Sequence, residues 1–311
     1  MQDLIIIGGG PAGLSAAIYA LRAKMDVILI EKLGIGGQIA LSDVIENYPG
    51  YRSISGSELM SKFENHAKDF GLKTEIATIE RIIDAGDRKI TKTDSKDFES
   101  KAVIIASGAQ PKKLGIKGEN EFTGRGVSYC ATCDGLFFSG RDIVVVGGGD
   151  TAVKEALYLS KIVNKIYLVH RRDRLRAEKI MQEKLLSNPK VEFLWNSAVD
   201  EISGGEMGVE RISVRNIQTN KKSEVKAEGI FVFVGITPET GFIDVKKNEG
   251  GFIITNDRME TSMKGVFAAG DCRNTPLRQV ATAVGDGAIA AISAEEYISH
   301  LEGKSYPTRM V

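Results

Sequence analysis

The chain has 311 residues, enough for two domains of ordinary size. Its 41 basic and 41 acidic side chains balance, so it presents no net charge that would attract nucleic acid or an anionic membrane. No apolar run approaches the ~18 residues of a membrane span, and MQDLIIIGGG lacks the features of a signal peptide. Because three cysteines cannot form a disulfide framework, we expect a cytoplasmic protein.

The first pattern along the chain is LIIIGGGPAGLSAAIYALRAKMDVILIEK, which begins at Leu4. Its two apolar runs lack polar alternation, as in parallel strands that are buried on both faces. Between them, Gly8, Gly10 and Gly13 form G-x-G-x-x-G. The first glycine makes a tight turn, the second admits a pyrophosphate, and the third lets the following helix pack on the strand. The pattern predicts a βαβ dinucleotide-binding unit.

The same pattern occurs again as IVVVGGGDTAVKEALYLSKIVNKIYLVHRR, which begins at Ile143. Here Gly147, Gly149 and Ala152 form the G-x-G-x-x-A variant of the turn. In each copy the turn leads into a helix, whose N-terminus attracts phosphate charge. The repeat therefore predicts two dinucleotide sites in one chain.

The two copies differ at the end of the second strand, where the ribose is recognised. Glu31 in the first copy can accept hydrogen bonds from ribose hydroxyls, but it would repel a 2′-phosphate. The second copy has His170, Arg171 and Arg172 there, with Arg176 one turn further on, and guanidinium groups bind phosphate well. We expect NADP(H) at the second site and a dinucleotide without that phosphate at the first. FAD and NADPH suit these sites, because a flavin accepts hydride and can pass two electrons to a disulfide.

Between the two copies lies SYCATCDG, which contains Cys130 and Cys133. A structural zinc site needs four ligands, and Cys272 with three histidines supplies no second ligand pair. A structural disulfide across two residues closes so short a loop that it gains little stability. Such a pair is better suited to thiol–disulfide exchange. Proton transfer then falls to Asp134, for which a simple turn or helix cap is the alternative role.

Seven motifs follow one another along essentially the whole chain. They are GGGPAG near the start, GGQIALSDVIENYPG at 36–50, ASGAQP at 106–111, CATCDG at 130–135, GGGDTA at 147–152, HRRDRLRAE at 170–178 and GVFAAGDCRNTPLRQVATAVGDG at 265–287. In this order they resemble the low-molecular-weight thioredoxin reductases of the flavin-dependent pyridine nucleotide–disulfide reductase superfamily.

The resemblance implies an α/β fold of two Rossmann-like, three-layer dinucleotide-binding domains, with the NADPH domain inserted into a discontinuous FAD domain. The FAD domain would comprise residues 1–110 and 243–311, and the NADPH domain, which carries the dithiol, residues 114–238. ASGAQPKKLGIKG and VFVGITPETGF would join them, since both carry Pro and Gly at the ends of apolar strands. The family also implies a homodimer and a rotation of one domain against the other.

The resemblance also implies roles for single residues. Cys133 would be the thiol nearest the flavin, Cys130 the thiol that attacks the protein substrate, and Asp134 the general acid/base. Asp271 would bind the flavin ribityl chain. The residues expected at FAD are Gly8, Gly10, Pro11, Ala12, Gly13, Glu31, Lys32, Gly36, Gly37, Gln38, Asn47, Gly270, Asp271, Arg278, Gln279 and Val280. The residues expected at NADPH are Gly147, Gly149, Asp150, Thr151, Ala152, His170, Arg171, Arg172 and Arg176.

The function expected from this resemblance is NADPH-dependent reduction of the disulfide of thioredoxin. One alternative takes electrons from ferredoxin, which Arg171, Arg172 and the intact GGGDTA disfavour. A second alternative is a reductase of another small dithiol protein. A third is a flavin ferredoxin–NADP oxidoreductase, which the CATC motif disfavours. A redox-sensing or flavin-binding interaction protein would bind the cofactor without turnover. For Cys272 we expect a buried small hydrophobe.

Overall fold

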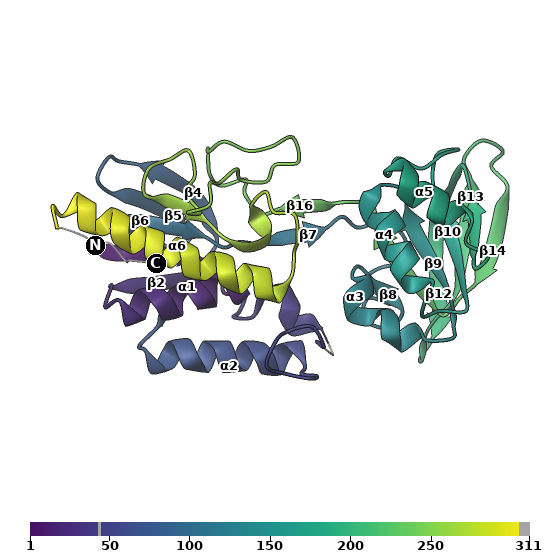
Figure 1. Ribbon diagram of the computed structural model, residues 1–311, viewed down its shortest axis with the longest axis horizontal. Coiled ribbons are helices and arrows are strands. Elements are labelled where there is room, and N and C mark those ends of the chain that lie inside the picture. The colour runs from purple at the N-terminus through teal and green to yellow at the C-terminus, as the bar shows by residue number, and fades with distance from the viewer. Residues whose placement is uncertain (43–44, 305–311) are drawn as a thin grey trace. The chain divides into compact units, whose positions relative to one another are not determined.

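The computed structural model describes residues 1–42 and 45–304, and the chain divides into two compact units (Figure 1). One unit comprises Met1–Gln110 and Thr237–Val311, and the other Pro111–Ile236. Positions 43–44 of the motif at 36–50 and positions 305–311 of the predicted last segment lie outside the described residues. Within the described ranges, no helix is long and apolar enough to cross a membrane.

The first unit is built on a seven-stranded sheet in the order β3-β2-β1-β6-β5-β4, with β17 also paired to β6. Strands β3, β2, β1, β6 and β17 pair in parallel, whereas β4 and β5 continue from β6 as antiparallel strands. The strands are β1 (Gln2–Ile7), β2 (Val27–Glu31), β3 (Lys73–Ile76), β4 (Ile79–Asp84), β5 (Lys89–Thr93), β6 (Asp97–Ile105) and β17 (Val266–Ala268).

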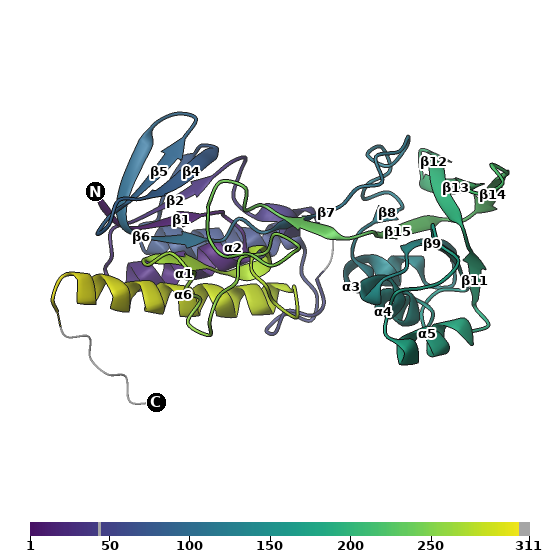
Figure 2. The ribbon, with the colours of Figure 1, turned by 90° about the horizontal axis from the view of Figure 1, so that it is seen from above.

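Helices cover one face of this sheet, and α1 and α6 lie side by side on it (Figure 2). The two helices approach closely because their facing residues are small: a Cβ at Gly287 would lie 2.1 Å from the carbonyl oxygen of Ala12. The opposite face packs against the segment that contains Ile243, Val245 and Ile253. The helical elements are α1 (Pro11–Arg22), η1 (Gly37–Leu41), α2 (Gly56–Asp69), η3 (Gly270–Cys272) and α6 (Val280–Leu301).

The second unit has a five-stranded parallel sheet in the order β11-β10-β9-β15-β8. Helices pack on one face of it, and a three-stranded antiparallel sheet, β12-β13-β14, packs on the other. Its helical elements are α3 (Ala131–Asp134), η2 (Gly135–Phe138), α4 (Asp150–Leu159) and α5 (Lys179–Leu186). Its strands are β8 (Val127–Ser128), β9 (Asp142–Gly147), β10 (Lys165–Val169), β11 (Val191–Leu194), β12 (Ser197–Gly205), β13 (Gly208–Asn216), β14 (Lys222–Lys226) and β15 (Gly229–Phe233). Two short strands, β7 (Ala109–Pro111) and β16 (Ile236–Pro238), pair where the chain passes from one unit to the other.

Each unit contains one copy of the predicted βαβ pattern, β1-α1-β2 in the first and β9-α4-β10 in the second. Leu4 of β1 pairs in parallel with Val27, and Ile143 of β9 pairs in the same way with Ile166. Both strands are buried on both faces, as the absence of polar alternation in the sequence predicted. The predicted α/β fold class of two Rossmann-like units is therefore confirmed.

Candidate functional site

The first glycine turn joins β1 to α1, and its three glycines meet different surroundings. A Cβ at Gly8 would lie 2.3 Å from the carbonyl oxygen of Ala106, and a Cβ at Gly13 would lie 1.9 Å from that of Gly8. Neither position has room for a side chain. A Cβ at Gly10, in contrast, would meet nothing within 4 Å. The backbone at Gly10 is therefore open to a group that approaches it closely, as a pyrophosphate does at such turns.

Glu31, at the end of β2, holds this turn in place through hydrogen bonds. Its Oε2 accepts a hydrogen bond from the N–H of Gly9 at 2.6 Å, and its Oε1 accepts one from the N–H of Lys32 at 2.7 Å. Oε1 also accepts the N–H of Leu33 at 3.3 Å. An ionised carboxylate has about four acceptor positions, so one remains for a hydroxyl of a ribose. The sequence predicted the ribose contact but missed the bond to Gly9.

A second glycine pair lies against the first turn. Gly36 donates its N–H to the carbonyl oxygen of Gly9 at 2.9 Å, and a Cβ at Gly37 would lie 3.3 Å from the Cα of Gly10. Both residues have positive φ, +126° and +59°, which glycine adopts without strain. Gln38 donates from its Nε2 to the carbonyl oxygen of Ala109. The structure thus brings Gly36 and Gly37 to the predicted turn, whereas Gln38 contacts β7.

The N-terminal end of α6 contributes further predicted FAD residues, which lie far from the first turn in sequence. Asn47 donates from Nδ2 to Oε1 of Gln279 at 3.0 Å, so two predicted FAD residues that are distant in sequence are in contact. The Gln279 side chain accepts a backbone N–H as half of a capping box with Thr282 at the start of α6. Val280 is the first residue of α6 and is buried.

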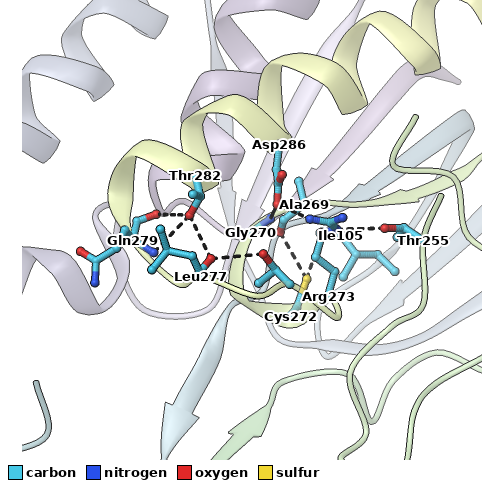
Figure 3. Close-up of polar contacts among 11 residues, drawn as sticks. Ile105, Thr255, Ala269, Gly270, Cys272, Arg273, Leu277, Gln279, Thr282 and Asp286 are labelled. Atoms are coloured by element: carbon cyan, nitrogen blue, oxygen red, sulfur yellow. Dashed lines mark hydrogen bonds and ion pairs between the residues drawn. The ribbon is translucent and has the colours of Figure 1, made fainter. Parts of the chain in front are cut away.

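The turn that contains Asp271 is fixed by a buried polar network (Figure 3). Oδ2 of Asp286 accepts a hydrogen bond from the N–H of Gly270 at 3.1 Å and lies 3.0 Å from Nη1 of Arg273. Nε of Arg273 in turn donates to Oγ1 of Thr255 at 2.9 Å. Arg273 and Asp286 are not among the residues predicted from the sequence. An aspartate within a helix of small, buried residues was the available signal, because a buried carboxylate requires partners.

Asp271 and Arg278 are partly buried polar groups whose charges act on each other. Burial raises the pKa of the Asp271 carboxyl, the charge of Arg278 opposes this, and that of Asp286 adds to it. In the described part of the chain, Nε of Arg278 is buried without a hydrogen-bond partner. The Arg278 guanidinium lies 4.3 Å from the centre of the Phe252 ring. A polyhydroxyl ligand would offer hydrogen bonds to both groups, so these residues fit FAD.

The second glycine turn, between β9 and α4, repeats the pattern of the first. A Cβ at Gly147 would lie 2.6 Å from the carbonyl oxygen of Phe233, whereas a Cβ at Gly149 would meet nothing within 4 Å. Oδ1 of Asp150 accepts the N–H of Glu178 at 2.9 Å, which ties the start of α4 to the segment after the arginines. Of the next two predicted residues, Thr151 is exposed and Ala152 is buried. This turn is also open to a pyrophosphate.

The ring of His170 packs against Gly148 of the second turn. A Cβ at Gly148 would lie 2.3 Å from the His170 ring, which is 5% exposed and whose Nε2 has no partner among the described residues. Burial lowers the pKa of His170, and the neighbouring charges of Arg176, Arg172 and Arg171 lower it further. The imidazole is therefore neutral at neutral pH.

The three predicted arginines are exposed around this turn. Arg176 donates its backbone N–H to the carbonyl oxygen of Gly148 at 2.7 Å, which brings the end of the basic segment to the glycine turn. Arg171 and Arg172 directly follow His170 at the end of β10. Exposed guanidinium groups beside an open dinucleotide turn fit the 2′-phosphate of NADPH.

Cys130 and Cys133 form a disulfide, with their Cα atoms 5.3 Å apart. Cys130 caps the short helix α3, which directly follows β8, and its Sγ lies 3.5 Å from Oγ1 of Thr132. Oδ2 of Asp134 accepts a hydrogen bond from Oγ of Ser128 at 2.6 Å. Both cysteines are partly exposed, so the disulfide can meet another reactant. Sequence reasoning identified the two cysteines and Asp134 but missed Ser128.

Cys272 is fully buried, as expected for a small hydrophobe. Its Sγ donates to the carbonyl oxygens of Ile105 and Ala269, each at 3.3 Å. Burial raises the pKa of this thiol to about 11. Cys272 is therefore a neutral thiol at physiological pH.

The family model of the pyridine nucleotide-disulphide oxidoreductases matches residues 2–287. A thioredoxin reductase of Bacillus subtilis (strain 168) is 48% identical over 97% of this chain and 96% of its own length. The crystal structure of thioredoxin reductase from Streptococcus pyogenes MGAS5005 is 45% identical, with a TM-score of 0.89 over 96% of this chain and 99% of that one.

A ferredoxin-flavin thioredoxin reductase from Clostridium acetobutylicum is less similar. It is 32% identical, with a TM-score of 0.53 over 96% of this chain and 98% of that one. The likeness to the Bacillus and Streptococcus proteins spans nearly all of each chain at higher identity. The resemblance inferred from the seven motifs is confirmed: the chain belongs to the pyridine nucleotide-disulphide oxidoreductase family and, within it, to the thioredoxin reductases.

Proposed function

We propose that this chain is an NADPH-dependent flavoenzyme that reduces the disulfide of thioredoxin through Cys130 and Cys133. FAD and NADPH are its cofactors. The observation that carries the proposal is the partly exposed Cys130–Cys133 disulfide, which lies in the same unit as an open glycine turn surrounded by exposed arginines. The other unit supplies a second open turn and the pair Asp271 and Arg278, of which Nε of Arg278 is buried without a hydrogen-bond partner among the described residues.

The residues of the first unit would hold FAD. Gly10 leaves space for the pyrophosphate, Glu31 accepts from the ribose, and Asp271 accepts from the ribityl hydroxyls. In the second unit, Gly149 would admit the pyrophosphate of NADPH, and Arg171 with its basic neighbours would bind the 2′-phosphate. When bound, FAD would supply the redox chemistry that links hydride from NADPH to the two-electron reduction of a disulfide.

The reduced pair then exchanges with the disulfide of thioredoxin. The Cys130 thiolate attacks one thioredoxin sulfur, so a mixed disulfide forms while the other sulfur leaves as a thiolate. Cys133 next attacks the sulfur of Cys130, which restores the Cys130–Cys133 disulfide and releases the second thioredoxin sulfur. Two electrons pass to thioredoxin, and each leaving thiolate takes one proton. Asp134 would take the proton from the attacking thiol and return it to the leaving thiolate.

The test begins with the purified yellow protein under anaerobic conditions. NADPH should bleach the flavin absorbance, and oxidised thioredoxin with a disulfide dye should then be reduced catalytically. Cys130→Ser and Cys133→Ser should retain FAD but lose thioredoxin reduction. A flavin that NADPH leaves unchanged and reduced ferredoxin bleaches would replace this proposal with the ferredoxin-dependent activity. Flavin binding without turnover by either donor would favour a redox-sensing protein.

We propose in addition that the protein works as a homodimer in the cytoplasm. Its likeness to the low-molecular-weight thioredoxin reductases supports the dimer, and its low cysteine content supports a reducing compartment. Light scattering of the purified protein should give twice the mass of one chain. A monomer over the whole accessible concentration range would contradict the assembly without affecting the proposed activity.

A further inference from the structure

Ser128 lies at the end of β8, two residues before the dithiol, and is 4% exposed. Its Oγ donates to Oδ2 of Asp134 at 2.6 Å and accepts the backbone N–H of Cys130 at 3.1 Å. The carbonyl oxygen of Cys130, at 3.3 Å, is a more distant acceptor for the same hydroxyl hydrogen. The shorter bond to a carboxylate is the stronger one. One buried hydroxyl thus contacts the backbone of the proposed attacking cysteine and the carboxylate of the proposed acid/base.

The local fold explains why this contact matters. Helix α3 has only four residues, so its own hydrogen bonds hold it weakly. Ser128, in contrast, is fixed in the parallel sheet, where it pairs with Phe231 of β15. The hydroxyl of Ser128 therefore links the side chain of Asp134, at the end of α3, to a strand of the sheet. Without it, Asp134 would lose its fixed bond to the sheet.

The charge of the carboxylate also depends on this contact. A hydroxyl that donates to a carboxylate favours its ionised form over its neutral form. The hydroxyl donor itself is buried, where loss of its hydrogen bond would not be replaced by bulk water. Ser128 therefore acts on two properties of Asp134, its position and its tendency to hold a proton.

We propose that Ser128 is a positioning residue of the thiol–disulfide exchange, which holds Asp134 and the backbone of Cys130 in place and sets the pH range in which Asp134 exchanges protons. This rests on the proposed function, since it assigns Ser128 a part in the same reaction. Ser128 contributes no electrons and no proton to the products. Its effect passes entirely through Asp134 and Cys130.

The neighbouring residue offers a matched control. Tyr129 donates from its hydroxyl to Oε1 of Glu119 at 2.9 Å, and Glu119 is 1% exposed. Tyr129→Phe therefore also removes a hydroxyl hydrogen bond from the segment before the dithiol. That hydroxyl is bonded to Glu119 and not to Asp134 or Cys130, so a general loosening of the segment would appear in this variant too.

The experiment compares Ser128→Ala, Ser128→Thr, Ser128→Val and Tyr129→Phe, each alone and with Asp134→Asn, in the FAD-loaded protein. Threonine and valine have nearly the same shape, but only threonine keeps the hydroxyl, so this pair remains informative if the alanine variant folds poorly. The rate at which reduced enzyme is reoxidised by thioredoxin is measured against pH. In parallel, the pair is reduced with dithiothreitol, and its alkylation by iodoacetamide is followed over the same pH range.

We expect Ser128→Ala and Ser128→Val to slow reoxidation about tenfold, as for loss of one hydrogen bond to a charged group. In these two variants, the part of the rate–pH curve that depends on Asp134 should have its midpoint at a pH higher by about one unit. Ser128→Thr should restore most of the rate, and Tyr129→Phe should leave the profile unchanged. In the Asp134→Asn background, the rates of the valine and threonine variants should differ by less than they do with Asp134, because only the bond to the Cys130 backbone is then lost.

The proposal is overturned if the rates of reoxidation of the valine and threonine variants depend on pH in the same way. It is also overturned if the two rates differ by the same factor with Asp134 and with Asn at position 134. Failure of the proposed function gives a different result. If the wild-type protein cannot reduce thioredoxin, the alkylation profiles of the dithiothreitol-reduced pair still decide the role of Ser128. A valine–threonine difference in alkylation that becomes smaller in Asp134→Asn supports it, and identical profiles reject it.

Discussion

Arg273 and Asp286 form a largely buried ion pair near the start of the last helix, with Nη1 and Oδ2 3.0 Å apart and side chains 14% and 12% exposed. The same oxygen of Asp286 accepts the N–H of Gly270 (Figure 3). A single carboxylate oxygen on α6 therefore receives two donors from the turn that contains Asp271. The ion pair thus links the position of α6 to the geometry of the proposed ribityl site.

Asp286→Asn should weaken both folding and FAD binding, because it leaves the charge of Arg273 without its counter-charge in a largely buried place. We expect the free energy of unfolding of the FAD-free protein to fall by about 3 kcal/mol and FAD affinity to fall about tenfold. Urea denaturation and FAD titration measure the two effects. Glu99→Gln, which breaks the exposed pair Arg88–Glu99 (3.1 Å), should cost less than about 1 kcal/mol. Equal losses in the two variants would contradict the role given to Asp286.

Gly10→Ala and Gly149→Ala should separate cofactor binding from folding. A Cβ at either position meets no atom within 4 Å, and Gly10 has an ordinary φ of −80°, as Gly149 has at −93°. Both variants should therefore fold normally. Each methyl group would occupy the place where a pyrophosphate approaches, so Gly10→Ala should weaken FAD binding alone and Gly149→Ala NADPH binding alone, each by at least tenfold. Gly13→Ala is the control for folding, because its Cβ would lie 1.9 Å from Gly8 and should prevent a stable fold.

Calorimetry with each cofactor and thermal unfolding of each variant check this prediction. If Gly10→Ala and Gly149→Ala bind both cofactors like the wild type, the open space at the two turns is not where the pyrophosphates bind. If both variants unfold, the glycines are needed for the fold itself.

The two dinucleotide units were predictable because they depend on local pattern. Continuous apolar runs predict buried parallel strands, and a glycine turn between a strand and a helix predicts a phosphate site. Because the pattern occurs twice, the end of the second strand can be compared between the copies, and an acidic Glu31 in one and a basic Arg171 in the other predict different nucleotides. These features lie within about 30 residues of one another in each copy, so no knowledge of the tertiary fold was needed.

The supporting contacts could not be predicted in the same way. Asp286 meets Gly270 only because α6 packs beside α1, and Glu31 meets Gly9 only because β2 lies next to β1. Ser128 and Asp134 are near in sequence, but their hydrogen bond depends on how β8 passes into α3. Side-chain partners that are set by tertiary packing leave no periodic signal in the sequence.

Replacing Arg171 and Arg172 together by alanine should abolish the preference for NADPH over NADH. The charge-assisted hydrogen bonds to the 2′-phosphate are lost, so we expect the ratio of kcat/KM for the two nucleotides to fall about 100-fold. Activity with NADH should change little. Arg141→Ala is a control that removes one exposed positive charge from the same unit, since Arg141 forms an exposed ion pair with Glu228 at 3.0 Å. An unchanged preference in the double variant would refute the phosphate assignment.

Cys272 should be chemically silent in the folded protein. Burial raises the pKa of its thiol to about 11, from the ordinary value of 9.0. After reduction at pH 8, iodoacetamide should therefore modify Cys130 and Cys133 but not Cys272, as peptide mass analysis would show. Modification of all three thiols in the native protein would contradict this.

The raised pKa of Cys272 also predicts the direction of a pH effect on stability. The unfolded thiol ionises near pH 9, whereas the folded thiol keeps its proton until about pH 11. The unfolded state therefore binds fewer protons in this window, and the contribution to stability, complete below pH 9, is lost as the pH rises to 11. Cys272→Ala removes this titration, so the difference in unfolding free energy between wild type and variant should narrow over that range. A difference that stays constant from pH 8 to pH 11 in urea denaturation would show that ionisation of Cys272 is not linked to folding.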